Sequence, residues 1–395
     1  MAVIERRHPS QLTMSRERLD LARTLLRDHV DSGRTPSIAA VVLHNGRVVL
    51  EESFGLQRPG GPDLELDHMW AIASAGKPCT AATVLSLVEE GRIGVMEPVV
   101  EYFPELGGAD NDDVLVHHLL THTAGWQSDL FSGRVLEVLA SGVVGDPPPG
   151  VDFLTHLCTW IALHPIRIAP LGELMAYGNM NYALLGELVR RVTGGSLDAA
   201  MRERVFEPLG MHRGALIVRG SERPHLVQRS PDLPFGSMEN GGIAMQGELW
   251  EASDLGESGA HMSPKDLARF GHAILEGGVL DGRRFLSANA VHSMCIDQIP
   301  GVPAMFGADT ILPVASWGYG FSVICEQRWP YFGGGLVSPG SVTHPGAGGI
   351  DFWVDFDNGI VGVLFEILTE MSPDLEPISG LSNRFQDVVT SAVQR

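Results

Sequence analysis

Residues 73–91, ASAGKPCTAATVLSLVEEG, begin with a polar, Gly-containing segment and continue as a long run of helix-forming residues. Pro78 suits a first helical turn, where few backbone N–H groups have partners, and Gly91 suits a helix stop. Ser74 then lies at or just before the first turn, three residues ahead of Lys77. Because side chains at i and i+3 share a helix face, with Cβ atoms roughly 5–6 Å apart, we expect these two side chains to touch.

This serine–lysine pair has a chemical interpretation and a plain one. A serine hydroxyl becomes a nucleophile when a neighbouring base takes its proton, and a buried lysine is such a base because burial disfavours its ammonium form. The positive end of the helix dipole acts in the same direction. The plain interpretation is a helix N-cap at Ser74 and a solvated Lys77. Since S-x-x-K spacing occurs by chance in most long chains, the pair alone does not decide between them.

A second motif lies in residues 176–189, AYGNMNYALLGELV, where Tyr177 and Asn179 precede an amphipathic helix pattern. A tyrosine near a cation can move protons, and an adjacent amide can hold a substrate carbonyl group. Alone, this motif is also weak.

A third motif lies in residues 340–354, GSVTHPGAGGIDFWV, where His344 and Gly346 lead through small residues into a strand. Small residues allow a substrate to approach the backbone closely. An edge-strand N–H group here would complete an oxyanion hole with the N–H of Ser74. The alternative is a Gly-rich turn before a strand.

Two β-rich hairpin patterns lie near opposite ends of the chain, joined by Asn-Gly pairs at 45–46 and 358–359. Asn-Gly supplies the positive φ angles of a type I′ turn. Helical patterns lie outside these hairpins, at residues 16–31 and 381–394. We therefore predict one antiparallel sheet, built from both termini and flanked by N- and C-terminal helices.

Residues 115 to 290 are instead dominated by helical periodicity. The predicted fold class is α/β (α+β), an antiparallel sheet with an inserted all-helical domain. We place the sheet domain at 1–114 and 300–395 and the insert at 115–299.

Composition excludes several classes of function. The formal net charge is −20 and no run of Lys or Arg forms a basic stripe, so nucleic acid is not an expected partner. The first thirty residues lack a signal-peptide core, and no apolar stretch is long enough for a membrane span. We expect a cytoplasmic protein without a membrane partner.

Other features are expected to be structural. The cysteines match no C-x-x-C pattern, so we interpret all four as buried thiols. His118 and His122 have i,i+4 spacing but no H-E-x-x-H context, and we expect neither a metal nor a cofactor. Ser287 is expected to cap a helix, and the chain has no G-x-S-x-G elbow.

The order S-x-x-K, Y-x-N, H-x-G resembles that of the penicillin-recognising serine hydrolases. These are the class C β-lactamases, D,D-peptidases, D-amino-acid amidases and family VIII carboxylesterases, and we expect the last group to be the nearest. Segments 119–126 (LLTHTAGW) and 262–278 (MSPKDLARFGHAILEGG) also look like family segments. The resemblance spans roughly residues 20 to 390 and implies the β-lactamase/transpeptidase-like fold, with the site between the sheet and the helical domain.

The resemblance implies catalytic roles for particular residues. Ser74 would be the nucleophile, Lys77 and Tyr177 would act together as base, and Asn179 would contact the lysine or the substrate. The amide of Ala347 would lie opposite that of Ser74 in the oxyanion hole. Which of Lys77 and Tyr177 is the base stays open.

Substrate-binding residues are expected on the sheet wall and among nearby aromatics. The resemblance places His344 and Gly346 on that wall. Three aromatic residues are candidates for an acyl pocket, with ordinary core packing as the alternative: Trp126, Trp317 and Tyr319. The chain departs from the family pattern in three places: Met175, Gly178 and Pro345.

The implied reaction is two-step acyl transfer through an acyl-enzyme. His344 is mostly neutral at pH 7 and offers a substrate carboxylate less than a lysine would, so we expect a carboxylesterase acting on small-molecule esters. The alternatives are an amidase, D-aminopeptidase or acyltransferase, a weak β-lactamase, or a non-catalytic binding relative. The sequence leaves open whether the chain is a monomer or a homo-oligomer.

Overall fold

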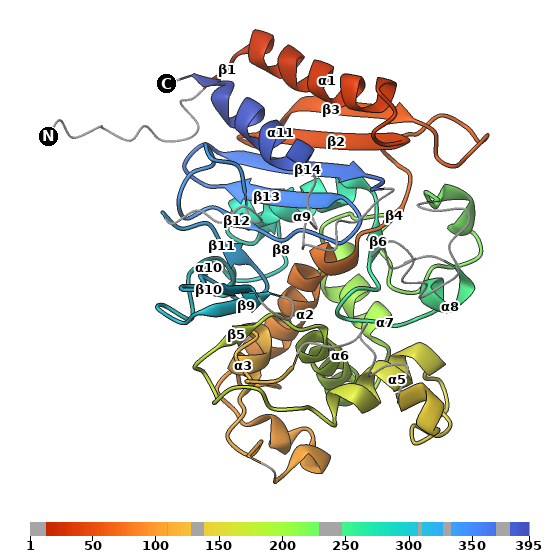
Figure 1. Cartoon of the computed structure of the whole chain (residues 1–395), viewed down its shortest axis with the longest axis vertical. Coiled ribbons are helices and arrows are strands. Elements are labelled where there is room, and N and C mark those ends of the chain that lie inside the picture. The colour runs from red at the N-terminus through yellow and green to blue at the C-terminus, as the bar shows by residue number, and fades with distance from the viewer. Residues whose placement is uncertain are drawn as a thin grey trace, which may run out of the picture.

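The fold is built on a six-stranded antiparallel sheet of order β11-β12-β13-β14-β2-β3 (Figure 1). The computed structural model describes residues 13–108, 110–127, 138–228, 247–306, 310–326, 333–368 and 380–394. The strands are β2 (Ser37–His44), β3 (Arg47–Gly55), β11 (Ser322–Val323), β12 (Val342–Thr343), β13 (Ile350–Asp355) and β14 (Ile360–Glu366).

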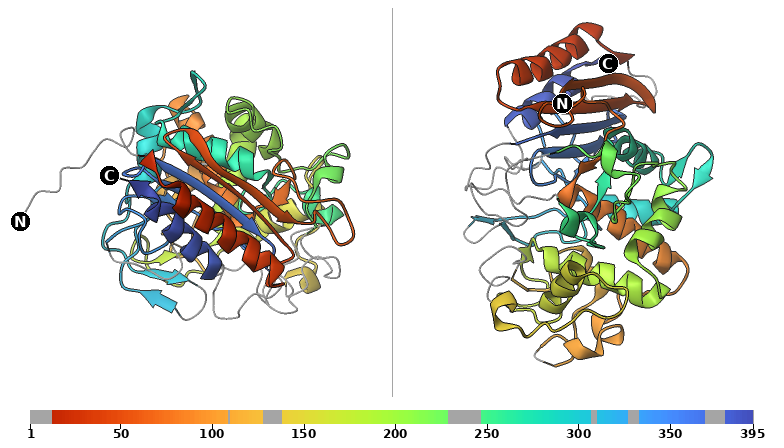
Figure 2. Two further views of the ribbon diagram at one scale, coloured as in Figure 1. Left: turned by 90° about the horizontal axis from the view of Figure 1, so that it is seen from above. Right: turned by 90° about the vertical axis from the view of Figure 1, so that its right-hand side faces the viewer.

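Strands from the N-terminal and C-terminal parts of the chain are neighbours in this sheet. β14 pairs antiparallel with β2, in a register that runs from Ile360↔His44 to Glu366↔Ile38. Helices α1 (Arg16–Asp31) and α11 (Gly380–Ser391) lie side by side on one face (Figure 2), and α9 (Pro264–Leu275) packs on the other. The predicted sheet of both termini with flanking helices is confirmed.

Alternation along β2 explains why the sheet is covered on both faces. Its even-numbered apolar residues share a buried cluster with α1 and α11: Ile38, Ala40 and Val42. Its odd-numbered residues join the larger core on the opposite face: Ala39, Val41 and Leu43.

One of the two predicted Asn-Gly turns differs from expectation. Asn45 and Gly46 have φ angles of 49° and 73°, as a two-residue type I′ turn requires. The β13–β14 connection is instead four residues long, and only its Gly359 has a positive φ, of 64°. Asn358 is held by hydrogen bonds to Asp355, so local side-chain bonding replaces the expected turn.

The region between the hairpins is mainly helical. Its helices are α3 (Val116–Leu120), α5 (Phe153–Ala162), α6 (Asn179–Thr193), α7 (Leu197–Met201), α8 (Glu248–Glu251) and α10 (Ala288–Cys295). Of these, α3, α5 and α6 lie at the opposite end of the molecule from α1 (Figure 1). Its short strands are β5 (Met175–Ala176), β6 (His261–Met262), β7 (Val279–Leu280), β8 (Arg283–Arg284), β9 (Ala304–Phe306) and β10 (Thr310–Leu312). Two further pairs complete the fold: β4 (Trp70–Ala71) with β6, and β1 (Thr13–Met14) with β15 (Val393–Gln394).

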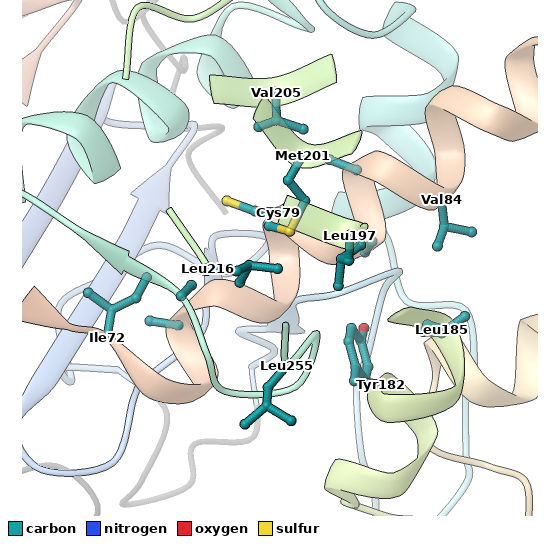
Figure 3. Packing of buried hydrophobic residues seen from close by; sticks show 14 of the residues in the cluster. Ile72, Cys79, Val84, Tyr182, Leu185, Leu197, Met201, Val205, Leu216 and Leu255 are labelled. Carbon is teal, nitrogen blue, oxygen red and sulfur yellow. The ribbon is translucent and has the colours of Figure 1, made fainter. Parts of the chain in front are cut away.

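Helix α2 (Lys77–Glu89) connects the sheet to the helical region. Cys79 and Val84 on α2 lie in one buried cluster with Leu185 of α6 and Met201 of α7 (Figure 3). α9 falls inside the predicted insert yet packs on the sheet. The proposed boundaries at 115 and 299 stay a prediction. Within the described part of the chain, no helix is long and apolar enough to cross a membrane.

Candidate active site

Ser74 lies in a tight turn that leads directly into α2. The 3₁₀ turn spans Ala73–Gly76, and α2 begins at Lys77. Ala73 has a φ of 49°, an uncommon conformation for a residue with a Cβ atom, which the surrounding structure must stabilise. Ser74 is partly exposed whereas Lys77 is fully buried. The turn therefore presents the hydroxyl and hides the amine.

The amine of Lys77 is the centre of the site. Three oxygen atoms surround its Nζ: Ser74 Oγ at 2.8 Å, Asn179 Oδ1 at 2.8 Å and the carbonyl oxygen of Glu257 at 2.7 Å. A neutral amine has two N–H donors and one lone pair, so it can donate to the amide and the carbonyl while accepting the hydroxyl proton of Ser74.

The environment of Lys77 favours that neutral form. Burial lowers the pKa of Lys77 to about 7, while the charge of Glu257 acts in the opposite direction. The ring centroids of Tyr177 and Tyr182 lie 5.1 and 5.8 Å from Nζ, where ring faces favour the cation and so, like Glu257, oppose the effect of burial. Burial therefore makes the free base of Lys77 far more accessible near neutral pH than that of an exposed lysine. The alternative of a solvated lysine is excluded by its burial.

Tyr177 occupies the turn between β5 and α6. Gly178 precedes the helix in an extended conformation and donates its N–H to His122 Nδ1 at 3.1 Å, and Asn179 is the first helical residue. The phenol of Tyr177 is hydrogen-bonded to Ser74, and burial raises its pKa above the usual range. The Y-x-N motif and the S-x-x-K motif thus meet at one point.

The third motif reaches the same point from the sheet. A Cβ atom added to Gly346 would lie 2.1 Å from the carbonyl oxygen of Ile72, two residues before Ser74. Glycine at 346 therefore permits the backbone that leads to Ala347 to approach the turn that carries Ser74. The sequence predicted an edge strand here, but β12 is covered by β11, which pairs with Val342 and Thr343. Residues 344–347 extend past that pairing.

His344 is a buried, uncharged side chain at the wall of the site. It is 1% exposed, its ring lies 6.0 Å from that of Tyr177 and 5.6 Å from that of Trp317, and Nδ1 lies 3.0 Å from the Pro345 carbonyl oxygen. Burial, with a smaller contribution from Lys77, lowers the pKa of His344 to about 3. The imidazole is therefore neutral at pH 7.

The candidate pocket aromatics occupy different places. Trp317 is buried, and its ring centroid lies 5.7 Å from that of Tyr177, so it packs against a residue of the site. Trp126 is a core residue whose indole N–H donates to Asn111 Oδ1 at 3.2 Å. Tyr319 is bonded to His117, with 3.0 Å between its hydroxyl oxygen and Nδ1. The structure brings only Trp317 of the three against the motif residues, and the acyl-pocket roles stay predictions.

The features interpreted as structural have ordinary partners. Ser287 accepts from Ala290 N at 3.1 Å, which confirms the helix cap. His118 Nδ1 accepts from the Leu115 N–H at 2.9 Å. None of the four cysteines forms a disulfide in the described part of the chain. Cys79 and Cys158 are buried, whereas Cys295 and Cys325 are only partly buried, so the expectation that all four thiols are buried is wrong for these two. In the described ranges no group of His, Cys, Asp or Glu is arranged to hold a metal.

Two residues at the site were not among the sequence candidates. His122 is buried with its ring 4.6 Å from that of Tyr177, and its segment was assigned only a structural role. Glu257 supplies the third oxygen to Lys77 through its backbone. The sequence feature that could have indicated Glu257 is a single glutamate among small residues, in GESGA (256–260).

A serine at hydrogen-bonding distance from a buried lysine, with a tyrosine and an asparagine beside them, defines a serine hydrolase of the S-x-x-K type. The chain belongs to the β-lactamase family, whose model matches residues 22–371.

Similarity to individual proteins agrees with this assignment. The chain is 28% identical over 346 residues to esterase EstB of Burkholderia gladioli, covering 82% of this chain and 83% of that protein. It is 28% identical over 351 residues to penicillin-binding protein 4 of Amycolatopsis lactamdurans, covering 84% and 82%. A family VIII carboxylesterase structure superposes with a TM-score of 0.69 at 20% identity, covering 96% of this chain and 99% of the other, which supports the fold.

Proposed function

We propose that the protein is a carboxylesterase that transfers the acyl group of an ester first to Ser74 and then to water. The observation that carries this proposal is the 2.8 Å contact between Lys77 Nζ and Ser74 Oγ in a site where the amine is fully buried. A free amine at that distance can accept the hydroxyl proton as the serine attacks a carbonyl carbon.

The two candidate bases are distinguished by their surroundings. Burial holds the pKa of Lys77 near 7 and raises that of Tyr177 above its usual range. Lys77 is therefore the group that accepts the Ser74 proton near neutral pH. Tyr177 keeps its proton and, hydrogen-bonded to Ser74, can pass a proton to the leaving alkoxide.

The negative charge of the tetrahedral intermediate needs backbone donors. The N–H of Ser74 at the start of α2 and the N–H of Ala347 on the sheet side are the proposed pair. Gly346 supports this assignment because it packs directly on Ile72, next to the nucleophile turn.

Neutral esters fit this site better than substrates that carry a carboxylate. His344 stands where a lysine would attract such an anion, and its imidazole is neutral because burial lowers its pKa to about 3. The similarity to EstB supports the same choice. We therefore place esters ahead of penicillins and peptides.

The test compares hydrolysis of p-nitrophenyl butyrate by the native chain, Ser74→Ala and Tyr177→Phe, with intact-protein mass spectrometry for the acyl adduct. Ser74→Ala is expected to lose about 10³-fold or more in kcat and to form no adduct. Tyr177→Phe is expected to lose about 10²–10⁴-fold, the usual contribution of a positioned proton donor. Ser32→Ala, at an exposed serine beyond α1, is the matched control and is expected to match the native rate.

Two outcomes would contradict the proposal. Nitrocefin hydrolysis faster than ester hydrolysis would move the assignment to a β-lactamase. Failure of both the ester and a fluorophosphonate to modify Ser74 would favour a non-catalytic binding protein.

A further inference from the structure

The segment 254–260 is held tightly against the nucleophile helix. Thr80 Oγ1 donates to the carbonyl oxygen of Gly256 at 2.6 Å. The N–H of Ile72 donates to the carbonyl oxygen of Ala260 at 2.9 Å. A Cβ atom added to Gly76 would lie 2.5 Å from Ala260 Cβ, so the two backbones are in close contact.

The same segment is pressed against α6 on its other side. A Cβ atom added to Gly256 would lie 2.9 Å from the Tyr182 carbonyl oxygen and 3.2 Å from Gly186 Cα. Because Glu257 follows directly, its backbone is fixed between two helices. Its side chain therefore has little freedom to reach solvent.

The carboxyl group of Glu257 is buried without a strong hydrogen-bond donor. The residue is 1% exposed, and among the described residues no N–H or O–H group of another residue donates to either carboxyl oxygen. Its own backbone N–H and the weakly polar thiol of Cys158 on α5 are the groups that interact with it at short range. An ionised carboxylate in such a place is costly, so burial raises the pKa of Glu257 and brings its protonated form within reach.

The charged and titratable groups around Glu257 come from every element packed on its segment. They are Lys77 of α2, Cys158 and the N-cap Asp152 of α5, Tyr182 and Arg190 of α6, and Asp254 of its own segment. Arg190 is already paired with Glu187 at 2.9 Å and with Asp254 at 3.4 Å. Lys77, by contrast, has neutral oxygens as its three hydrogen-bond partners.

Lys77 and Glu257 are therefore two buried groups whose net charge can be zero in two protonation states. They can exist as a charged pair, or as a free amine beside a protonated acid. Only the second state leaves the Lys77 lone pair free for the Ser74 proton. Burial moves the pKa values of both groups to about 7, so both states lie within reach near neutral pH.

We propose that Lys77 and Glu257 hold one proton between them at neutral pH, and that Glu257 is a positioning residue that carries this proton while Lys77 acts as the base. The proposal rests on the proposed function in taking Ser74 as the nucleophile. As Ser74 Oγ bonds to the carbonyl carbon, its proton moves to Lys77 Nζ. It leaves from there to the departing alkoxide, directly or through Tyr177. Glu257 keeps its own proton throughout.

The chain offers an unusually direct test because it contains two lysines, Lys77 and Lys265. Protein labelled with ¹³Cε-lysine gives one NMR signal for each, and Lys265→Arg assigns them. The side chain of Lys265 is 45% exposed and serves as an internal reference. In the native chain we expect the Lys77 signal to titrate near pH 7, far below the value of about 10.4 for an ordinary lysine side chain. A Lys77 midpoint close to that ordinary value would overturn the proposal without any variant.

Glu257→Gln removes the charge and keeps the shape. Removing a nearby carboxylate is expected to lower the Lys77 midpoint by about one pH unit. Glu366→Gln, at another buried glutamate whose salt-bridge partner is His29 of α1, is the matched control and is expected to leave the midpoint unchanged. Glu257→Met is a second variant of similar length, for use if the glutamine variant does not fold. An unchanged Lys77 midpoint in a folded Glu257 variant would refute the coupling.

The acid limb of kcat/KM for p-nitrophenyl butyrate is expected to move with the NMR midpoint, about one unit toward lower pH, with KM unchanged. A merely structural role for Glu257 would lower the rate without moving that limb. Because the NMR readout does not need turnover, a shifted Lys77 midpoint in a chain without esterase activity would reject the proposed function and keep the proton sharing.

Discussion

Replacing Gly346 with alanine tests whether the sheet side of the site is set by its contact with the nucleophile turn. The added Cβ atom would lie 2.1 Å from the Ile72 carbonyl oxygen and 3.0 Å from Ile350 Cβ. Both neighbours are fixed, because Ile72 donates its N–H to Ala260 and Ile350 is paired with Gly346. The clash must be relieved by moving backbone, not a flexible side chain.

The size of that movement follows from the geometry. Real Cβ atoms stay at least 3.0 Å from such neighbours, so the strand and the turn must separate by about 0.9 Å. A displacement of about 1 Å at a reacting centre costs about 10²-fold in rate. We therefore expect kcat on p-nitrophenyl butyrate to fall about 100-fold in Gly346→Ala, with KM changed less than about threefold, because the loss falls on the transition state.

The assay measures kcat, KM and thermal unfolding of Gly346→Ala beside Gly195→Ala. A Cβ atom added to Gly195 would meet no atom within 4 Å, and the φ of Gly195 is not positive, so this variant is expected to behave as native. A native kcat in Gly346→Ala would refute the idea that this contact sets the oxyanion hole. A lowered melting temperature with unchanged kcat would assign Gly346 to stability alone.

Three further predictions concern charge and burial. Asn179→Asp places a carboxylate where Oδ1 now lies 2.8 Å from Lys77 Nζ, so the acid limb of kcat/KM should move at least about one unit toward higher pH; an unmoved limb would contradict the role of Lys77. His344 has a folded pKa of about 3 against 6.5 for the ordinary group, so below pH 6.5 the unfolded chain binds a proton that the native chain does not. Stability should fall by up to ~1.4 kcal/mol per pH unit as pH drops through that window, and urea unfolding of His344→Gln should lose this slope. Burial raises the pKa of the Cys79 and Cys158 thiols, so both should resist DTNB in the native chain and react in urea; equal rates in the two conditions would contradict their burial.

The parts of the fold that sequence predicts well are those decided by local chemistry. Asn45-Gly46 makes its own turn because both residues tolerate positive φ. The second Asn-Gly pair fails as a local predictor because Asn358 bonds not only to Asp355, three positions before it, but also to Ser338, twenty positions away. The conformation of a turn that depends on a distant partner cannot be predicted from the four residues of the turn alone.

The site shows the same division. Ser74 and Lys77 are neighbours on one turn, so their contact follows from spacing alone. The grouping of Tyr177 with them was predicted from the order of motifs. Trp126 and Trp317 were equal candidates because both are large apolar residues, and only the tertiary structure separates a core tryptophan from one packed against Tyr177.

Glu257 marks the limit of sequence reasoning at this site and explains why a serine–lysine pair needs a whole fold. The proposed role of Lys77 as a base requires an amine that is buried away from water, and its other two oxygen partners come from residues 102 and 180 positions away in sequence. Those partners are delivered by α6 and by the segment 254–260, which reach Lys77 because glycines remove the side chains that would keep the backbones apart. By burying one lysine, the helical region gives a common four-residue spacing the dry surroundings that the proposed serine–lysine pair requires.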